Sequence, residues 1–258
     1  MCLASIRTRS KLSGMCRFLS FALLVTGLAV QVRAQAPGDA FTVQDLLQRY
    51  TESYGGLRDA NQLSSVSMEG VQIQGEQEYV FHLHKKRPAS MRYQMERGGT
   101  ILTSVYNGRK GWLRIKQGSE ESVEELSGPK LEMLKKEARF ESPLFRHLEK
   151  PQNSVKLVSR ELVERTEAFV IRVEEPGNVV SLFYMDPQTA RILRIDHLDE
   201  NDEVVFQTLY RDYKDVGGFP FAHEIENRMN GKTVSLTVLE SVVVNPGLLS
   251  FYFENPGR

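Results

Sequence analysis

The sequence predicts a mainly β fold of the α+β class, in which a large antiparallel sheet carries a few helices. From about residue 64 onward, apolar side chains recur with a period of two, as at Tyr79, Phe81 and Leu83. Turn-forming dipeptides separate these runs, and Asn107-Gly108 and Asn230-Gly231 are strong hairpin signals. Ten or so short strands joined in this way predict an antiparallel sheet, either curled into a barrel or folded as a sandwich.

Several of the expected strands are apolar on both faces. In the run 179–185 only Ser181 is polar, and 203–213 is similar, whereas a sheet with one solvated face alternates more cleanly. This predicts cover on both faces, by helices, by a second sheet or by an apolar ligand. Besides the runs before residue 97, the expected strands are 100–106, 111–116, 154–160, 168–174, 179–185, 190–198, 203–213, 220–229 and 232–244.

Two segments show helical spacing instead. Residues 41–54 repeat apolar side chains every three or four positions, with Thr42 and Asp45 as an N-cap signal. Residues 128–150 predict two short helices separated near Ser142-Pro143, with Pro129 in the first turn. The second segment interrupts the series of strands, and its apolar stripes must be buried, so we expect it to pack on one face of the sheet.

The amino-terminal residues have the pattern of a cleaved export signal. Residues 1–17 are basic and 18–30 are apolar, and small residues allow cleavage after Ala34 or after Ala36. The alternative is a single membrane anchor, although 13 apolar residues are fewer than the ~20 that span a bilayer. We therefore expect a signal peptide at 1–34 and a soluble mature chain at 35–258.

The charge and the cysteines divide between these two parts. The whole chain has 33 basic and 33 acidic residues, but five of the basic ones and both cysteines lie in 1–34. The mature chain then holds 28 basic against 33 acidic residues, a net charge of −5, and no cysteine. This excludes disulfides and thiol chemistry, argues against a nucleic-acid partner, and favours the bacterial periplasm.

Candidate chemical sites are few. His82 and His84 share one face of a strand but are followed by basic residues, so we expect no metal there. The acidic run 199–203 is typical of a solvated turn. No hydrolase, metalloprotease or P-loop motif is present, so we expect no catalytic residue, no metal and no cofactor, and a secreted hydrolase is the third choice of function.

Several short strings, taken in order, resemble the outer membrane lipoprotein-sorting protein-like family, within the LolA-like lipoprotein localisation factor superfamily. The resemblance covers about residues 41–256. The strings are Tyr54-Gly55-Gly56-Leu57, Met68-Glu69-Gly70, Tyr106-Asn107-Gly108 followed by Trp112, Tyr184-Met185-Asp186-Pro187-Gln188-Thr189, Tyr210-Arg211-Asp212-Tyr213, Gly217-Gly218-Phe219-Pro220, Val244-Asn245-Pro246 and Phe253-Glu254-Asn255-Pro256.

This resemblance implies one domain at 35–258, a curved, incomplete antiparallel β-barrel with helices covering its concave face. It also implies an apolar cavity for a lipid or a lipoprotein acyl chain, and a role in envelope lipid or lipoprotein trafficking. The carrier's functional arginine matches no position here. The expected cavity-lining residues are Phe81, Leu83, Met91, Tyr93, Met95, Trp112, Leu134, Phe145, Phe183, Met185, Phe206 and Tyr210.

We therefore expect a periplasmic, non-enzymatic binding protein whose partner is a lipid or a lipidated protein. The alternative is an envelope sensory or regulatory module that has the same fold but no cargo, and that docks on an inner- or outer-membrane protein. We expect a monomer in both cases. In this sequence-based view the lining residues face a ligand or, alternatively, form an ordinary core beneath the helices of 128–150.

Overall fold

The computed structural model describes residues 41–55, 62–140, 142–149 and 154–257. All of them belong to one compact unit, Ala40–Arg258. The expected signal peptide at 1–34, with its two candidate cleavage sites, lies outside the described residues. Among the helices that are described, none has both the length and the apolar character needed to cross a membrane.

The fold is dominated by a single antiparallel sheet of thirteen strands that is not closed into a barrel. The sheet therefore agrees with the predicted mainly β class and with the curved, incomplete barrel. The strands are β1 (Ser65–Gln74), β2 (Gln77–Lys86), β3 (Ser90–Arg97), β4 (Thr100–Tyr106), β5 (Gly111–Gln117), β6 (Glu120–Glu125), β7 (Ser154–Val163), β8 (Thr166–Glu175), β9 (Val179–Met185), β10 (Ile192–Leu198), β11 (Val204–Val216), β12 (Phe219–Met229) and β13 (Lys232–Val244).

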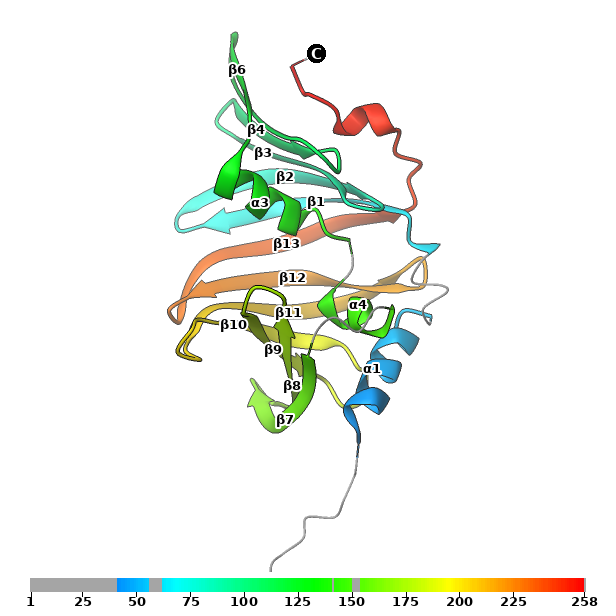
Figure 1. Cartoon of the computed structure of the whole chain (residues 1–258). Coiled ribbons are helices and arrows are strands. Elements are labelled where there is room, and N and C mark those ends of the chain that lie inside the picture. The colour runs from blue at the N-terminus through cyan, green and yellow to red at the C-terminus, as the bar shows by residue number, and fades with distance from the viewer. Residues whose placement is uncertain (1–40, 56–61, 141, 150–153, 258) are drawn as a thin grey trace, which may run out of the picture. The chain divides into compact units, whose positions relative to one another are not determined.

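The first and the last strands pair in the middle of the sheet. The order is β6-β5-β4-β3-β2-β1-β13-β12-β11-β10-β9-β8-β7, so β6 and β7 form the two opposite edges (Figure 1). Asn245 fastens the central pair, because its side-chain oxygen accepts hydrogen bonds from the backbone N–H groups of Ser64 and Ser65 at 2.8 and 3.1 Å. The string Val244-Asn245-Pro246 thus connects the first and the last strand where the two halves of the sheet meet.

The helices form where the sequence predicts them. Helix α1 (Val43–Glu52) begins with a capping box between Thr42 and Asp45, so the N-cap signal is confirmed. Helix α3 (Gly128–Glu137) has Pro129 in its first turn, and α4 (Pro143–Glu149) follows after the expected break. A short 3-10 helix, η1 (Ser250–Phe253), lies near the carboxyl end.

Helices α3 and α4 lie in the segment that joins the two edges of the sheet. This segment runs from the end of β6 to the start of β7, so it has to pass across one face of the sheet. Figure 1 shows α3 and α4 on the same side of the strands, with α1 beside α4. We call this side the covered face and the other side the open face, and we call residues 126–149 the crossing segment.

The covered face holds two separate apolar clusters. The α3 cluster lies over β3 to β5 and includes Met91, Tyr106 and Leu134. The α4 cluster lies over β8 to β10, where α1 and α4 pack on side chains such as Phe183 and Ile171. Gly111 allows α3 to approach closely, because a Cβ atom at this position would lie 2.8 Å from Leu134 Cδ2.

The open face has its own apolar clusters, which confirms that some strands are apolar on both sides. Val170 and Tyr184 of β8 and β9 are buried there, and Trp112 packs with Val105 and Phe253 near β4 and β5. The prediction of cover on both faces thus agrees with the structure only in part, since much of the open face between these clusters carries exposed valines such as Val80 and Val238.

An ion network on the open face joins the turn after β7 to β11 and β12. The Arg211 guanidinium contacts carboxylates of Glu164, Glu224 and Glu226, and Arg228 adds a 2.6 Å contact to Glu226. Hydrogen bonds from Arg228, Thr233 and Arg211 lower the pKa of the Glu226 carboxyl to about 2, against the opposing effect of its burial. The network therefore favours the ionised carboxylate.

Strand β6 was not predicted. Its sequence, Glu-Glu-Ser-Val-Glu-Glu, contains no apolar alternation, and all six residues are exposed. It forms because its backbone pairs with β5 over its whole length. The strand propensity of its residues and the burial of its side chains contribute little. The helix predicted over 41–54 is shorter by two residues at each end, since the capping box defines its start and Ser53 its C-cap.

We predict that Met91→Ala lowers the free energy of unfolding by about 3 kcal/mol, because it opens a cavity beneath α3. Denaturant titration followed by circular dichroism measures the change. The matched control is Val80→Thr on the neighbouring strand β2, which is exposed on the open face and should change stability by less than about 0.5 kcal/mol. If both substitutions lowered the free energy of unfolding equally, the assignment of Met91 to the covered face and of Val80 to the open face would be contradicted.

We predict that Glu226 makes stability depend on pH between about 4.5 and 2. Its pKa is lowered in the folded state, so its contribution is complete above the unfolded pKa of 4.5 and is lost as the pH falls toward 2. Glu226→Gln should cost about 2 kcal/mol at pH 7, and should flatten the decline of stability in this pH window. Thermal unfolding at a series of pH values tests this, and a parallel decline in both proteins would refute it.

Candidate ligand-binding face

The candidate site is the central strip of the covered face, between the α3 and α4 clusters. Among the described residues, the main contacts between helices and strands are those of α1 with β7, of α3 with β4 and β5, and of α4 with β8. The four middle strands of the sheet are not among these contacts. These are β1, β13, β12 and β11. The strip consists of side chains that the strand registers place on the covered face and that remain half-buried: Met68, Gln72, Tyr210, Ile225, Asn227, Thr237 and Val242.

Two rows of hydrogen bonds cross this strip. In the first row, the Tyr93 hydroxyl donates to Gln72 Oε1, and Gln72 Nε2 donates to the Thr237 hydroxyl, each at 3.1 Å. In the second row, the Thr208 hydroxyl donates to Asn227 Oδ1, and Asn227 Nδ2 donates to Ser235 Oγ, each at 3.0 Å. The strip therefore has satisfied polar groups between two apolar clusters.

Four tyrosines line the side of the strip next to α1 and α4. They are Tyr50 and Tyr54 of the α1 region and Tyr210 and Tyr213 of β11. Burial raises the pKa of all four hydroxyls, to about 12 for Tyr210. Tyr210 nevertheless keeps part of its surface accessible.

The crossing segment is fastened over the strip by contacts to both halves of the sheet. Lys85 Nζ of β2 donates a 2.9 Å hydrogen bond to the Arg139 carbonyl, and Arg139 and Arg146 contact Glu175 of β8 at 3.5 and 2.5 Å. The Tyr50 hydroxyl also donates to Ser142 Oγ at 3.1 Å. These polar contacts add to the apolar packing of Leu134 and Leu144 in the two clusters.

Lys85 lies in an unusual environment for an amine. Burial lowers its pKa to about 8, against an opposing effect from the Glu137 carboxylate. Burial also raises the pKa of Glu137 itself, and that of the Tyr93 hydroxyl to about 12. These three groups thus influence one another's ionisation beneath the end of α3.

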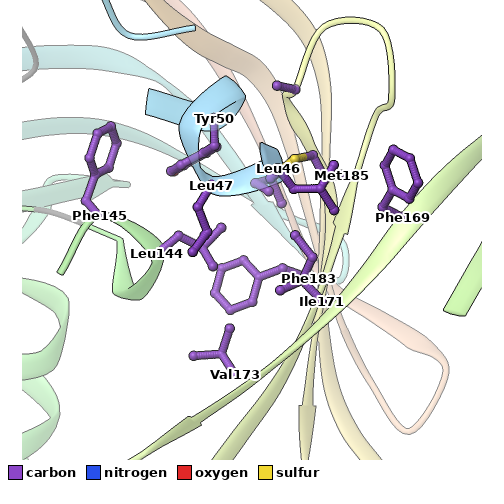
Figure 2. Close-up of a cluster of buried hydrophobic side chains, with 12 residues drawn as sticks. Leu46, Leu47, Tyr50, Leu144, Phe145, Phe169, Ile171, Val173, Phe183 and Met185 are labelled. Atoms are coloured by element: carbon purple, nitrogen blue, oxygen red, sulfur yellow. The ribbon is translucent and has the colours of Figure 1, made fainter. Parts of the chain in front are cut away.

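The structure places eleven of the twelve expected lining residues on the covered face or on its helices. Phe145, Phe183 and Met185 belong to the α4 cluster, and Figure 2 shows them with Leu46 and Leu47 of α1 and Leu144 of α4. Most of these side chains are buried by the protein itself. The eleven are Phe81, Leu83, Met91, Tyr93, Met95, Leu134, Phe145, Phe183, Met185, Phe206 and Tyr210.

Trp112 has to be corrected, because it lies on the open face. It pairs with Val105, whereas Tyr106 and Gly111 point to the covered face. Alternation along β5 therefore directs Trp112 away from the strip. Sequence reasoning also missed Gln72, Thr237 and Lys85, whose polar character gave no sign of a binding face; the period-two pattern was the only signal that places them there.

Neither of the candidate metal sites gains support. His82 lies 3.5 Å from Glu69 and His84 contacts the Ser67 hydroxyl at 2.9 Å, both on the open face. Asp199 accepts backbone hydrogen bonds from Asn201 and Glu203, as in an ordinary tight turn. Within the described residues, no group of three or more His, Cys, Asp or Glu side chains is placed to hold a metal ion.

Solved structures of similar fold are known. A DUF1329 family protein of Desulfovibrio piger is 12% identical with a TM-score of 0.60, over 84% of this chain and 98% of that one. The LolA superfamily protein NE2245 of Nitrosomonas europaea is 14% identical with a TM-score of 0.53, over 83% and 98%. The fold is LolA-like.

A third structure extends the same LolA-like comparison. It is a putative outer membrane lipoprotein-sorting protein domain of Vibrio parahaemolyticus, 12% identical with a TM-score of 0.56, over 81% of this chain and 95% of that one. At these identities the similarity establishes the fold, as the resemblance in the sequence predicted. No protein-family model matches the chain, and no curated protein matches it by sequence.

We predict that the Lys85 amine titrates near pH 8 because it is buried. Competitive labelling with an amine-reactive reagent, read by peptide mass spectrometry, gives the midpoint. In Glu137→Gln the midpoint should move lower, because the carboxylate that raises the pKa of Lys85 is removed. A midpoint near 10.5, the ordinary value for lysine, would show that the amine is hydrated.

Proposed function

We propose that this protein is a periplasmic, non-enzymatic binding protein that holds a lipid or a lipoprotein acyl chain on the covered face. The cargo lies on the central strip, between the α3 and α4 clusters. The apolar clusters on either side supply the walls, and the crossing segment supplies the lid. We further propose that the chain is exported by its amino-terminal signal and takes part in envelope lipid or lipoprotein trafficking.

The observation that carries this proposal is the incomplete cover of the strip. Met68, Ile225 and Val242 stay half-buried on the same face where Met91 and Phe183 are buried. An acyl chain laid across these side chains would remove further apolar surface from water, at about 0.8 kcal/mol for each buried methylene. The hydrogen-bonded rows would meet the ester or amide group at the polar end of such a chain.

The fastening of the crossing segment fits a lid that opens. Part of its contact with β2 and β8 consists of hydrogen bonds and ion pairs, and these exchange with water at a smaller net cost than buried apolar contacts. A cargo can therefore enter when these polar contacts loosen, while Leu134 and Leu144 keep α3 and α4 packed in their clusters. No covalent chemistry is required for this function.

The alternative function is an envelope sensory or regulatory module without cargo. The exposed valines of the open face, including Val80 and Val238, favour it, because they offer a surface to a protein partner. Native mass spectrometry of protein purified from the envelope separates the two functions. Co-purifying lipid supports the binding protein, whereas a ligand-free mass together with one stoichiometric membrane protein in a pull-down supports the module.

We predict that Ile225→Asp weakens the binding of a fluorescent fatty acid at least tenfold, because the new carboxylate in the strip must be desolvated when the fatty acid binds. The fluorescence titration is run with circular dichroism on the same samples.

The matched control is Val238→Asp, which lies on the neighbouring strand β13 but on the open face. It should bind the probe as the unchanged protein does. Equal binding by both folded variants would contradict a site on the strip, and absence of binding by the unchanged protein would contradict cargo of this kind.

A further inference from the structure

Large apolar side chains are exposed around η1, close to the carboxyl end of the described chain. Leu249 is 62% exposed, Phe251 is 68% exposed and Tyr252 is 41% exposed. The rings of Phe251 and Tyr252 lie 5.8 Å apart, so these side chains adjoin one another. Single exposed apolar residues are common on protein surfaces, but a group of this size on one short turn is not.

The turn that carries these side chains is fixed to the sheet from below. Phe253 is buried against Val105 and Trp112 on the open face. Lys86 Nζ donates a 2.8 Å hydrogen bond to the Leu248 carbonyl, and Asn107 Nδ2 donates to Glu254 Oε2 at 3.3 Å. The exposed side chains therefore stand on a rigid support, and their exposure is not the result of a fraying chain end.

The exposed group continues onto the open face. The Tyr252 ring lies 5.4 Å from the His84 ring, and His84 contacts the Ser67 hydroxyl. Ser67 is the register partner of Val243, which is 48% exposed. We call Val243, Leu249, Phe251 and Tyr252 the docking patch.

Cationic side chains accompany the docking patch. The Arg92 guanidinium lies 5.7 Å from the centre of the Tyr252 ring, and Lys86 holds the turn itself. Arg109 is exposed in the β4–β5 turn, whose Asn107 contacts Glu254. The nearby carboxylates include Glu254, Glu125 and Glu69; Glu125 forms an ion pair with Lys110 at 2.8 Å, and Glu69 lies 3.5 Å from His82. Arg92, Lys86, Arg109 and Lys110 outnumber these carboxylates, so the balance of charge beside the patch is positive.

We propose that the docking patch binds the surface of an anionic phospholipid membrane. Leu249 and Phe251 insert between the head groups, while Arg92 and Arg109 face the lipid phosphates. Exposed aliphatic and aromatic side chains beside arginine and lysine are the combination that interfacial membrane anchors use, since the apolar part enters the acyl boundary and the cations stay at the head groups.

Flotation of the exported protein with lipid vesicles tests the proposal. The vesicles contain phosphatidylethanolamine and phosphatidylglycerol in a three-to-one ratio, and vesicles of phosphatidylcholine are compared. We expect binding to the anionic vesicles that weakens as salt is added, and Phe251→Ala should reduce it about tenfold. Arg109→Gln should reduce binding to anionic vesicles only.

The matched control is Leu162→Ala in the edge strand β7, because Leu162 is also 68% exposed but lies at the other end of the sheet. It should leave vesicle binding unchanged. Equal losses from Phe251→Ala and Leu162→Ala, or no binding to either kind of vesicle, would overturn the proposal. The fatty-acid titration reports separately on cargo binding. Phe251→Ala should therefore bind the fluorescent fatty acid as the unchanged protein does, whether or not the patch binds a membrane.

Discussion

Pairing of the first and last strands is the constraint on which the rest of the structure depends. Because β1 and β13 meet in the middle of the sheet, β6 and β7 are forced to opposite edges. The residues between them must then cross a face, and they do so as two short helices with polar fastenings. A covered face and an open face are thus consequences of strand order, and so is a crossing segment that contacts both halves of the sheet.

The strip and the docking patch lie on opposite faces of the sheet, and they share only β13, which carries Val242 of the strip and Val243 of the patch. The registers give β13 half-buried side chains toward the helices and exposed valines away from them. This is the ordinary result of alternation in a β-strand, and it lets one set of strands carry two surfaces of different chemistry. A substitution on one side leaves the other side chemically unchanged, which makes the two proposals separable.

The sequence was sufficient to predict the class of fold because its strands alternate clearly and its turns use Asn-Gly and Asp-Pro chemistry. Asp186, for example, accepts backbone hydrogen bonds from Gln188 and Thr189 and so closes the turn that the string predicted. Alternation does not reveal which face the helices cover, and for this reason Trp112 was placed on the wrong side. Strand β6 was missed because a partner strand, and not its own apolar pattern, holds it in the sheet.

Within each half of the sheet the paired strands are close together in the sequence, whereas the two strands that join the halves, β1 and β13, are far apart in it. Every neighbouring pair except β1 and β13 joins strands that follow one another in sequence. Hairpins of this kind close quickly because their loops are short, whereas the pairing of β1 with β13 closes a loop that contains almost the whole chain. The halves β1–β6 and β7–β13 are therefore expected to form early and to join last. Until that step, β1 and β13, which carry part of the proposed binding strip, are unpaired edges, and an export pathway that delivers an unfolded chain would have to protect them.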